Sequence, residues 1–257
     1  CPVCVTATER IDQALALSQK PGVILCSYGD MLRVPGSDGS DLLGRRVAGS
    51  DVRVIYSPLD VLDLARANRH CQVVFFAVGF ETTAPATALL AKQAQLLGLD
   101  NLKLLVAHVR VAPVLDQLLA DSACAVDGVL AAGHVCTVMG EPEYAQLVAQ
   151  HQIPMVVTGF TPEDLLQGVL SCVDQLEAGE PALQNAYQLV VEKGGNRAAQ
   201  ALIDAVFEPT DTPWRGLGVI RAGGYRLRAA FAGLDLSYQN VAVDLDEGCA
   251  NPCPSGL

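Results

Sequence analysis

Two cysteines three positions apart open the chain, in the order Cys1-Pro2-Val3-Cys4. Thiols at this spacing can close a small disulfide ring, in which one cysteine attacks a partner disulfide and the second resolves the mixed disulfide. Pro2 stiffens such a ring, because its φ is fixed and it has no amide hydrogen. The same two thiols can instead supply half of a zinc site, which needs a second pair of ligands. The pair alone leaves both chemistries open.

A helical pattern follows the cysteine pair. Ile11, Ala14 and Leu15 recur at helical spacing within residues 8–17. Thiolates just before a helix lie near the positive end of its dipole, which lowers a thiol pKa. This arrangement is typical of thioredoxin-like proteins and favours the redox interpretation.

Polar residues at the ends of predicted strands are the next candidates, because open parallel sheets form sites at the carboxyl ends of their strands. Glu81, Thr82 and Thr83 stand between a predicted strand and a predicted helix. Either threonine is expected to cap that helix, whose first amides have no partner within it. Glu81 precedes the cap, where capping does not need it, so we expect it to have a functional role.

A histidine occupies the corresponding place after another strand. His134 follows Gly133 in a predicted loop, and Cys136 comes two residues later. His108 also follows a strand and is a weaker candidate. A further polar cluster, residues 158–164, matches a capping box with Thr161 as the cap, and we assign it a structural role.

Two more cysteines, Cys249 and Cys253, lie among proline, glycine and asparagine near the end of the sequence. Small, turn-forming neighbours suit a metal or iron–sulfur site, because a cluster needs close approach of the backbone. Two cysteines cannot complete a four-thiolate site. They are therefore either part of a larger ligand set or idle surface thiols.

Composition narrows the class of protein. The chain has 257 residues, 51% hydrophobic and 18% charged, which is typical of a core-rich globular protein of one or two domains. A net charge of −11 argues against nucleic acid or an anionic membrane as the main partner. No apolar run reaches the length of a membrane span. Nine scattered cysteines, several within apolar runs, favour a reducing cytoplasm. With no initiator methionine and a cysteine-rich stretch at each end, we expect a fragment.

Several common catalytic fingerprints do not occur in the sequence. It contains no P-loop, no G-x-G-x-x-G after a strand and no G-x-S-x-G elbow. Nucleotide hydrolysis, nicotinamide chemistry and serine hydrolysis therefore lack their usual motifs.

Apolar strands alternate with helical patterns through most of the chain, which predicts an α/β fold with parallel sheets covered on both faces. We expect two such domains, residues 1–70 and 71–180, with the boundary near His70. Beyond them, residues 181–207 read as a long helix interrupted at 194–196. A β-hairpin turning at Gly223-Gly224 is expected to follow.

In combination and in this order, three stretches resemble the HypD family: Cys1-Pro2-Val3-Cys4, the G-F-E-T-T run of residues 79–83, and Gly133-His134-Val135. Residues 27–36, 56–60 and 214–218 support the resemblance, which covers essentially the whole sequence.

The resemblance implies a maturation factor for [NiFe] hydrogenases, a redox-active scaffold rather than a conventional turnover enzyme. On it an iron carrying two cyanides and one carbon monoxide is assembled, with a small HypC-type chaperone and a HypE-type protein that donates cyanide. The family fold has two α/β domains of thioredoxin-like character and a [4Fe–4S] domain. Residues 181–257 would then be the connecting helix, the hairpin and the start of the cluster domain.

The family's functional residues carry over one by one. Cys1 and Cys4 match its redox pair, Glu81, Thr82 and Thr83 its G-F-E-T-T motif, and His134 its G-H-V motif. Cys253 resembles the first metal ligand of the cluster, whereas Cys249 is not a clear match.

Some features depart from the family's pattern. The C-G-G-H-T segment, whose cysteine binds the iron, does not occur, nor do the later cluster cysteines, so neither metal centre is expected to be complete. Cys136 stands where the family usually has serine. Two rival functions stay open: a thiol–disulfide oxidoreductase acting on proteins, and a structural zinc protein.

Overall fold

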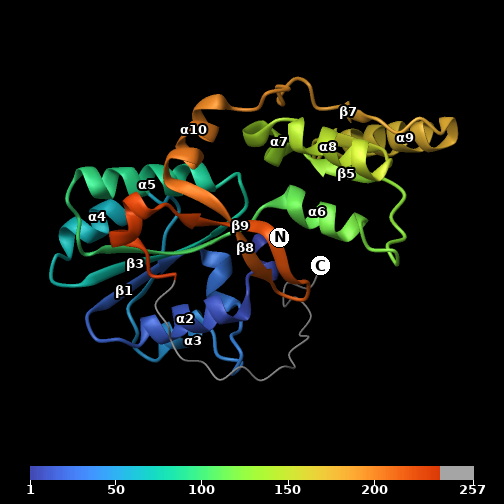
Figure 1. Ribbon diagram of the computed structural model, residues 1–257. Helices are drawn as coiled ribbons and strands as arrows, with labels where there is room; N and C mark the ends of the chain where they lie inside the picture. Colours follow the sequence, from blue (N-terminus) through green and yellow to red (C-terminus); the bar gives the residue numbers. More distant parts are fainter. Residues whose placement is uncertain (238–257) are drawn as a thin grey trace. The chain divides into compact units, whose positions relative to one another are not determined.

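A computed structural model describes residues 1–237 of the protein (Figure 1). The chain forms two compact units. Of the described residues, the first contains Cys1–Val109 and residues 202–237, and the second contains Arg110–Ala201. Cys249 and Cys253, the two cysteines of the predicted cluster segment, lie outside the described residues.

The first unit is built on a four-stranded parallel sheet. Its strands are β1 (Val23–Ser27), β2 (Val52–Val54), β3 (Gln72–Gly79) and β4 (Leu102–His108), in the order β2-β1-β3-β4. This order reverses between β1 and β3, and ligands of doubly wound sheets bind at the carboxyl ends of the strands beside such a reversal. Gly79, at the end of β3, is therefore in the region where a site is expected.

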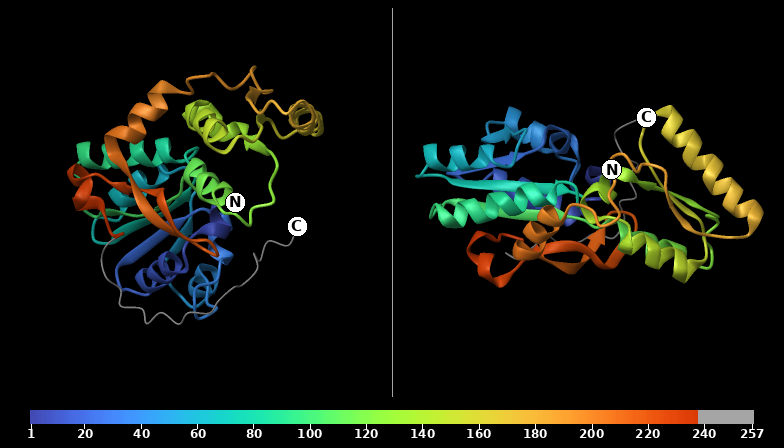
Figure 2. Two further views of the ribbon diagram at one scale, coloured as in Figure 1. Left: turned by 45° about the vertical axis from the view of Figure 1, so that its right-hand side comes forward. Right: turned by 90° about the horizontal axis from the view of Figure 1, so that it is seen from above.

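Helices cover both faces of this sheet (Figures 1 and 2). On one face, α2 (Thr8–Ser18) and α3 (Leu42–Val47) join a core with Leu25, Val74 and Phe76 of the sheet. On the other lie α4 (Asp60–Ala67) and α5 (Ala84–Leu96). A single helical turn, α1 (Pro2–Val5), and the 3-10 helix η1 (Gly29–Arg33) complete this part of the unit.

An antiparallel hairpin also belongs to the first unit. It consists of β8 (Phe207–Trp214) and β9 (Gly218–Leu227), followed by the 3-10 helix η2 (Ala229–Leu234). The hairpin is confirmed, but its predicted turn at Gly223-Gly224 is wrong. The chain turns at residues 215–217, where Gly216 and Gly218 have φ of 81° and 76°. Gly224 instead lies within β9, where a Cβ would come 2.8 Å from the His108 carbonyl oxygen.

The second unit holds a three-stranded parallel sheet in the order β5-β6-β7. Its strands are β5 (Val129–Ala132), β6 (Met155–Thr158) and β7 (Leu183–Asn185). Helices α6 (Val111–Leu119) and α8 (Pro142–His151) pack on one face in a common core, and α9 (Pro162–Ala178) lies against β5 and β6 on the other. The unit also contains α7 (Gly133–Met139). Helix α10 (Arg197–Val206) joins the two units along the chain.

The predicted α/β class and the two parallel sheets are confirmed. The structure differs from the prediction in the helix expected at residues 181–207 and in the boundary expected near His70. Residues 181–207 are not one interrupted helix, because β7 adds to the sheet and only α10 is helical there. The boundary expected near His70 falls inside the first unit, because β3 pairs in parallel with β1. No helix within residues 1–237 is long and apolar enough to cross a membrane.

Candidate functional site

The two N-terminal cysteines lie on one turn of helix. Cys1 occupies the N-cap position of α1, and the Cys4 amide donates to the Cys1 carbonyl over 3.2 Å. Residues three apart on a helical turn face the same side. Cys1 is exposed and Cys4 is half-buried, so the first thiol is the more accessible of the two. The longer helix α2 begins at Thr8, as the sequence predicts.

Contacts on both sides of this turn hold it against the sheet of the first unit. Val3 packs on the core that contains Phe76 and Val78 of β3. Just beyond the turn, Thr6 forms a β-bridge with Trp214, and the Arg215 amide donates to the Val5 carbonyl over 2.9 Å. The cysteine turn is thus fixed between the sheet and the hairpin.

The G-F-E-T-T run forms the connection from β3 to α5, as predicted. Glu81 is completely buried, and Thr82 and Thr83 are half-buried. The Phe80 ring lies 6.4 Å from the ring of Trp214. Trp214 therefore contacts this connection as well as the segment that follows Cys4. Trp214 is the single tryptophan of the sequence, and in the sequence it supports the family resemblance within residues 214–218 but is not predicted to be a site residue.

Thr83 does not form the predicted helix cap. It occupies the N-cap position of α5, but its backbone is already helical, with φ −102° and ψ −13°, and its side chain accepts no amide hydrogen bond. Its hydroxyl instead donates to the Phe80 carbonyl over 3.2 Å and lies 3.5 Å from Nδ1 of His108. The Thr83 hydroxyl thus faces Phe80 and His108 and not the first amides of α5.

His108 lies beneath the G-F-E-T-T connection, and its Nε2 is 3.0 Å from the Thr87 hydroxyl. The imidazole is only 1% exposed, and burial lowers its pKa to about 4. At neutral pH the ring is therefore uncharged, with one nitrogen a donor and the other an acceptor. His108 and Gly79 pair across β3 and β4, and a Cβ on Gly79 would come 1.7 Å from the Thr83 hydroxyl.

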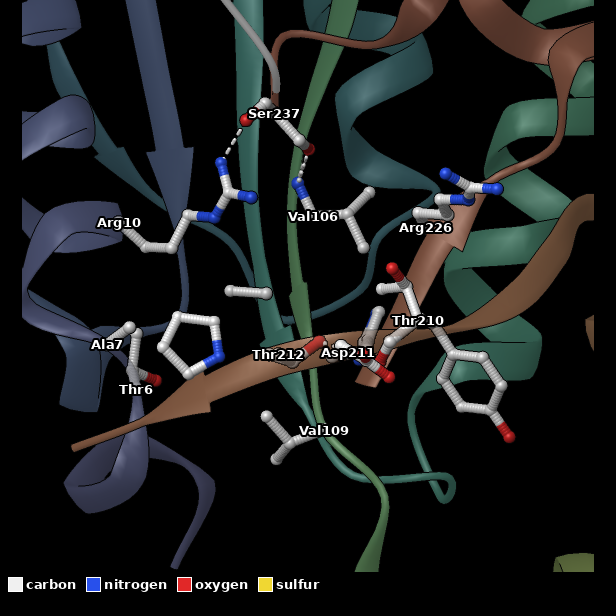
Figure 3. Close-up of a pocket in the computed structure, with 14 residues that line it drawn as sticks. Thr6, Ala7, Arg10, Val106, Val109, Thr210, Asp211, Thr212, Arg226 and Ser237 are labelled. Atoms are coloured by element: carbon white, nitrogen blue, oxygen red, sulfur yellow. Dashed lines mark hydrogen bonds between the residues drawn. The ribbon is translucent and has the colours of Figure 1, made fainter. Parts of the chain in front are cut away.

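A cavity of about 180 Å³ opens behind the cysteine turn, within the first unit (Figure 3). Its lining comes from the start of α2, from β4 and from the hairpin, and includes Thr6, Arg10, His108, Thr212 and Arg226. The Arg10 guanidinium donates to the Ser237 carbonyl, and the Val106 amide donates to the Ser237 hydroxyl over 3.0 Å. Figure 3 shows these two bonds closing the same side of the cavity.

His134 belongs to the second unit, whereas the other described candidates belong to the first. It is in the first turn of α7, not in the predicted loop, because β5 leads directly into that helix. Its exposed ring lies 4.9 Å from the ring of Phe160, and partial burial lowers its pKa. Cys136 is buried in the core of the second unit.

The capping box predicted at residues 161–164 is confirmed. The Asp164 amide donates to the Thr161 hydroxyl over 3.1 Å, and the Thr161 amide donates to the Asp164 carboxylate over 3.3 Å. Capping of α9 therefore accounts for the polar residues of this cluster, as the sequence predicts.

Two other cysteines, Cys26 and Cys172, are buried, unlike the N-terminal pair. Burial raises the pKa of Cys26 to about 12 and also raises that of Cys172, so both thiols stay protonated at neutral pH. Among residues 1–237, no three histidine, cysteine, aspartate or glutamate side chains gather in a group that could hold a metal ion. The described residues therefore do not provide a four-thiolate site, and Cys253 lies outside them.

Comparison with known proteins gives one consistent group of relatives. A family model described as "HypD: Hydrogenase formation hypA family" matches residues 1–256. "Hydrogenase maturation factor HypD" of Azotobacter vinelandii is 42% identical over 266 residues, which cover 100% of this chain and 70% of the relative. The protein of the same name from Rhodobacter capsulatus is 43% identical over 259 residues, covering 97% and 68%. That of Escherichia coli (strain K12) is 42% identical over 236 residues, covering 91% and 63%.

Proposed function

The chain belongs to the HypD family of hydrogenase maturation factors, and from this premise we propose that it is a redox-active scaffold for the iron group of [NiFe] hydrogenases. The iron with its two cyanides and one carbon monoxide is the cargo. The proposed partners are a HypC-type chaperone and a HypE-type cyanide donor, and the proposed compartment is the reducing cytoplasm. The two α/β units would be the family's thioredoxin-like domains.

The observation that carries this proposal is the joining of two family motifs through one residue. Trp214 bridges to Thr6, two positions after Cys4, and its ring lies beside Phe80 of the G-F-E-T-T run. Helix α1, which follows the exposed Cys1 and contains Cys4, thereby contacts β3, and doubly wound sheets bind their ligands at the carboxyl ends of such strands. A dithiol anchored in this way can act on a group bound at that end of the sheet.

The redox step we propose is a two-electron oxidation of the dithiol. As the sulfur–sulfur bond forms, both S–H bonds break, two protons pass to solvent water, and two electrons pass to the iron-containing cargo, which acts as the oxidant and is reduced by two electrons. A thiol that is exposed makes the first contact, and its half-buried neighbour closes the ring. The turn of α1 already places both residues on one side, so ring closure needs little rearrangement of the backbone.

The remaining candidate residues would handle protons and orientation. Glu81, completely buried at the start of the connection to α5, would be a proton donor or a supporting hydrogen-bonding group for the diatomic ligands of the cargo. Thr82 and Thr83 would orient the connection, and His134, on the second unit, is proposed as a proton or hydrogen-bond donor in the maturation reaction. A [4Fe–4S] cluster in the family supplies electrons when bound. The described residues do not form a binding site for such a cluster. Cys253, outside the described residues, is a candidate ligand for it.

We predict that Cys1 and Cys4 form one reversible disulfide couple. In thiol–disulfide buffers of graded potential, alkylation and mass measurement should show two thiols appearing together. Cys1→Ser and Cys4→Ser should each abolish this couple, and Cys71→Ser, a matched half-buried control, should retain it. A wild-type chain whose two thiols stay reduced over the whole range would contradict the redox assignment.

The rival function, a disulfide oxidoreductase acting on other proteins, makes a different prediction. Such an enzyme would catalyse reduction of the insulin disulfides by a small thiol, and Cys1→Ser would remove that catalysis. A scaffold dithiol is expected to have no effect on the insulin reaction while still forming its own couple. The two experiments together separate the scaffold from the oxidoreductase.

A further inference from the structure

Helix α9 presents its apolar side to solvent and its small, polar side to the sheet. Its buried residues are only Gly168, Ser171 and Cys172. Six large apolar side chains of the helix are more than a third exposed, led by Leu166 at 65% and Leu170 at 58%. They are Leu165, Leu166, Val169, Leu170, Val173 and Leu176. In contrast, the leucines of α2 are buried: Leu15 is 4% exposed and Leu17 is 3% exposed.

The exposed residues form one continuous face. At about 100° of rotation per residue, all six lie within less than half of the helix circumference, and the buried residues occupy a separate sector that begins beside Leu165. Contacts with the sheet explain this orientation. A Cβ on Gly168 would come 2.3 Å from the Thr158 side chain, and the Gln184 amide donates to the Ser171 hydroxyl over 3.2 Å. The helix therefore cannot turn its leucines inward without losing a close, hydrogen-bonded contact.

The charge around this face is of one sign. Glu163, Asp174 and Glu177 border it along one edge of the helix, and residues 160–182 contain no lysine or arginine. A second copy of the same face would bring like charges together, and an anionic membrane would be repelled as well. A complementary surface must combine aliphatic side chains with basic residues.

From the inverted orientation and the acidic edge of α9, we propose that its outward face is a docking surface for a basic amphipathic helix of a partner protein. The aliphatic side of that helix would cover the six exposed residues, and its lysines or arginines would pair with the acidic edge. An exposed aliphatic face of this extent on one helix is typical of an interaction site. This inference does not depend on the redox chemistry proposed for the first unit.

A designed peptide tests the proposal directly. The probe is a fluorescently labelled helix of about 18 residues with leucines on one side and lysines along both borders. Its twin carries glutamate in place of every lysine. Fluorescence anisotropy with the whole protein should show binding of the lysine peptide that weakens as salt is added, and binding of the glutamate twin about tenfold weaker or less.

Matched variants locate the binding. Leu166→Gln with Leu170→Gln alters only exposed side chains and should weaken binding about tenfold, as should Asp174→Asn with Glu177→Gln. Leu96→Gln, on a residue of α5 that is 79% exposed, is the control and should leave the affinity unchanged. Circular dichroism confirms that each variant is folded.

Three results would overturn the proposal. Equal binding to wild type and to the α9 leucine variant would show attraction to the acidic chain in general. A concentration-dependent dimer that the leucine variant abolishes would show that the face takes a second copy. Sedimentation of the wild type, but not the variant, with anionic vesicles would show that it takes a membrane.

Discussion

Gly79 occupies the point where the G-F-E-T-T connection, β4 and His108 meet. A side chain there would collide with the Thr83 hydroxyl, which lies 1.7 Å from the position of a Cβ. The strand conformation of Gly79 does not itself require glycine, because its φ is not positive. Space, and not backbone freedom, therefore determines the residue type at this position.

We predict that Gly79→Ala destabilises the first unit by about 1–3 kcal/mol through overpacking. Adding Thr83→Ala removes the colliding hydroxyl and should recover about 1 kcal/mol of that loss in a double-mutant cycle measured by urea unfolding. Gly29→Ala is the control, because its Cβ would meet only Val54 at an ordinary 3.6 Å. Additive effects of the two substitutions would contradict the close contact.

His108 makes stability depend on pH in a defined window. In the unfolded chain its pKa is near 6.5, and burial lowers it to about 4 in the folded protein. Between these values the unfolded state binds more protons, so stability is lost as the pH falls through this range and is fully present above it. Between about pH 7 and about pH 5, His108 should account for about 2 kcal/mol of lost stability.

Urea unfolding of the wild type and of His108→Gln at these two pH values measures this effect. Glutamine has no group that titrates in this range, so the variant should lose about 2 kcal/mol less than the wild type on acidification, whatever its stability at pH 7. An equal loss in both proteins would mean that His108 is not buried in its neutral form.

At the scale of the elements, local sequence signals predicted most strands and helices closely. The apolar run within residues 72–78 predicts a strand buried on both faces, and β3 spans Gln72–Gly79 with all but its first residue buried. The same holds for the helix start at Thr161, where the capping residues are adjacent in the sequence.

The errors arose where distant residues decide the local structure. Gly223 and Gly224 resemble a turn, but Gly224 is needed for the close approach of His108, far away in the sequence. Thr83 resembles a cap, but its hydroxyl turns toward the same histidine. Trp214 joins two motifs that lie far apart in the sequence, so neighbouring residues could not reveal its role.

The capping box of α9 gives a prediction for a whole element. Thr161→Ala removes the acceptor for the Asp164 amide and should destabilise the protein by about 1 kcal/mol, whereas Thr161→Ser keeps the hydroxyl and should cost much less. Thermal unfolding followed by circular dichroism measures both. If alanine and serine are equally destabilising, the methyl group and not the hydrogen bond is important.

At the scale of the whole molecule, the two units contribute different features. The first contains the cysteine turn, the G-F-E-T-T connection and the cavity behind them, and the second contains His134 and the exposed face of α9. Two α/β units, each with its own parallel sheet, were predictable because most of their strands and helices have a local signal, β7 and α7 being among the exceptions. Which segments make up each unit was not predictable, because the chain returns from the second unit and completes the first unit with the hairpin.

Infrared spectroscopy of the protein tests the scaffold function most directly. The full-length protein, with the family's C-G-G-H-T segment, is co-expressed with a HypC-type chaperone and purified without oxygen, and spectra are recorded in the region of cyanide and carbon monoxide stretches, where polypeptide does not absorb. The scaffold function predicts bands of both ligands on iron in the wild type. It also predicts their loss in Cys1→Ser and their presence in Cys71→Ser. A complex that contains the chaperone and iron but shows neither band, or a Cys1→Ser variant that retains both, would contradict it.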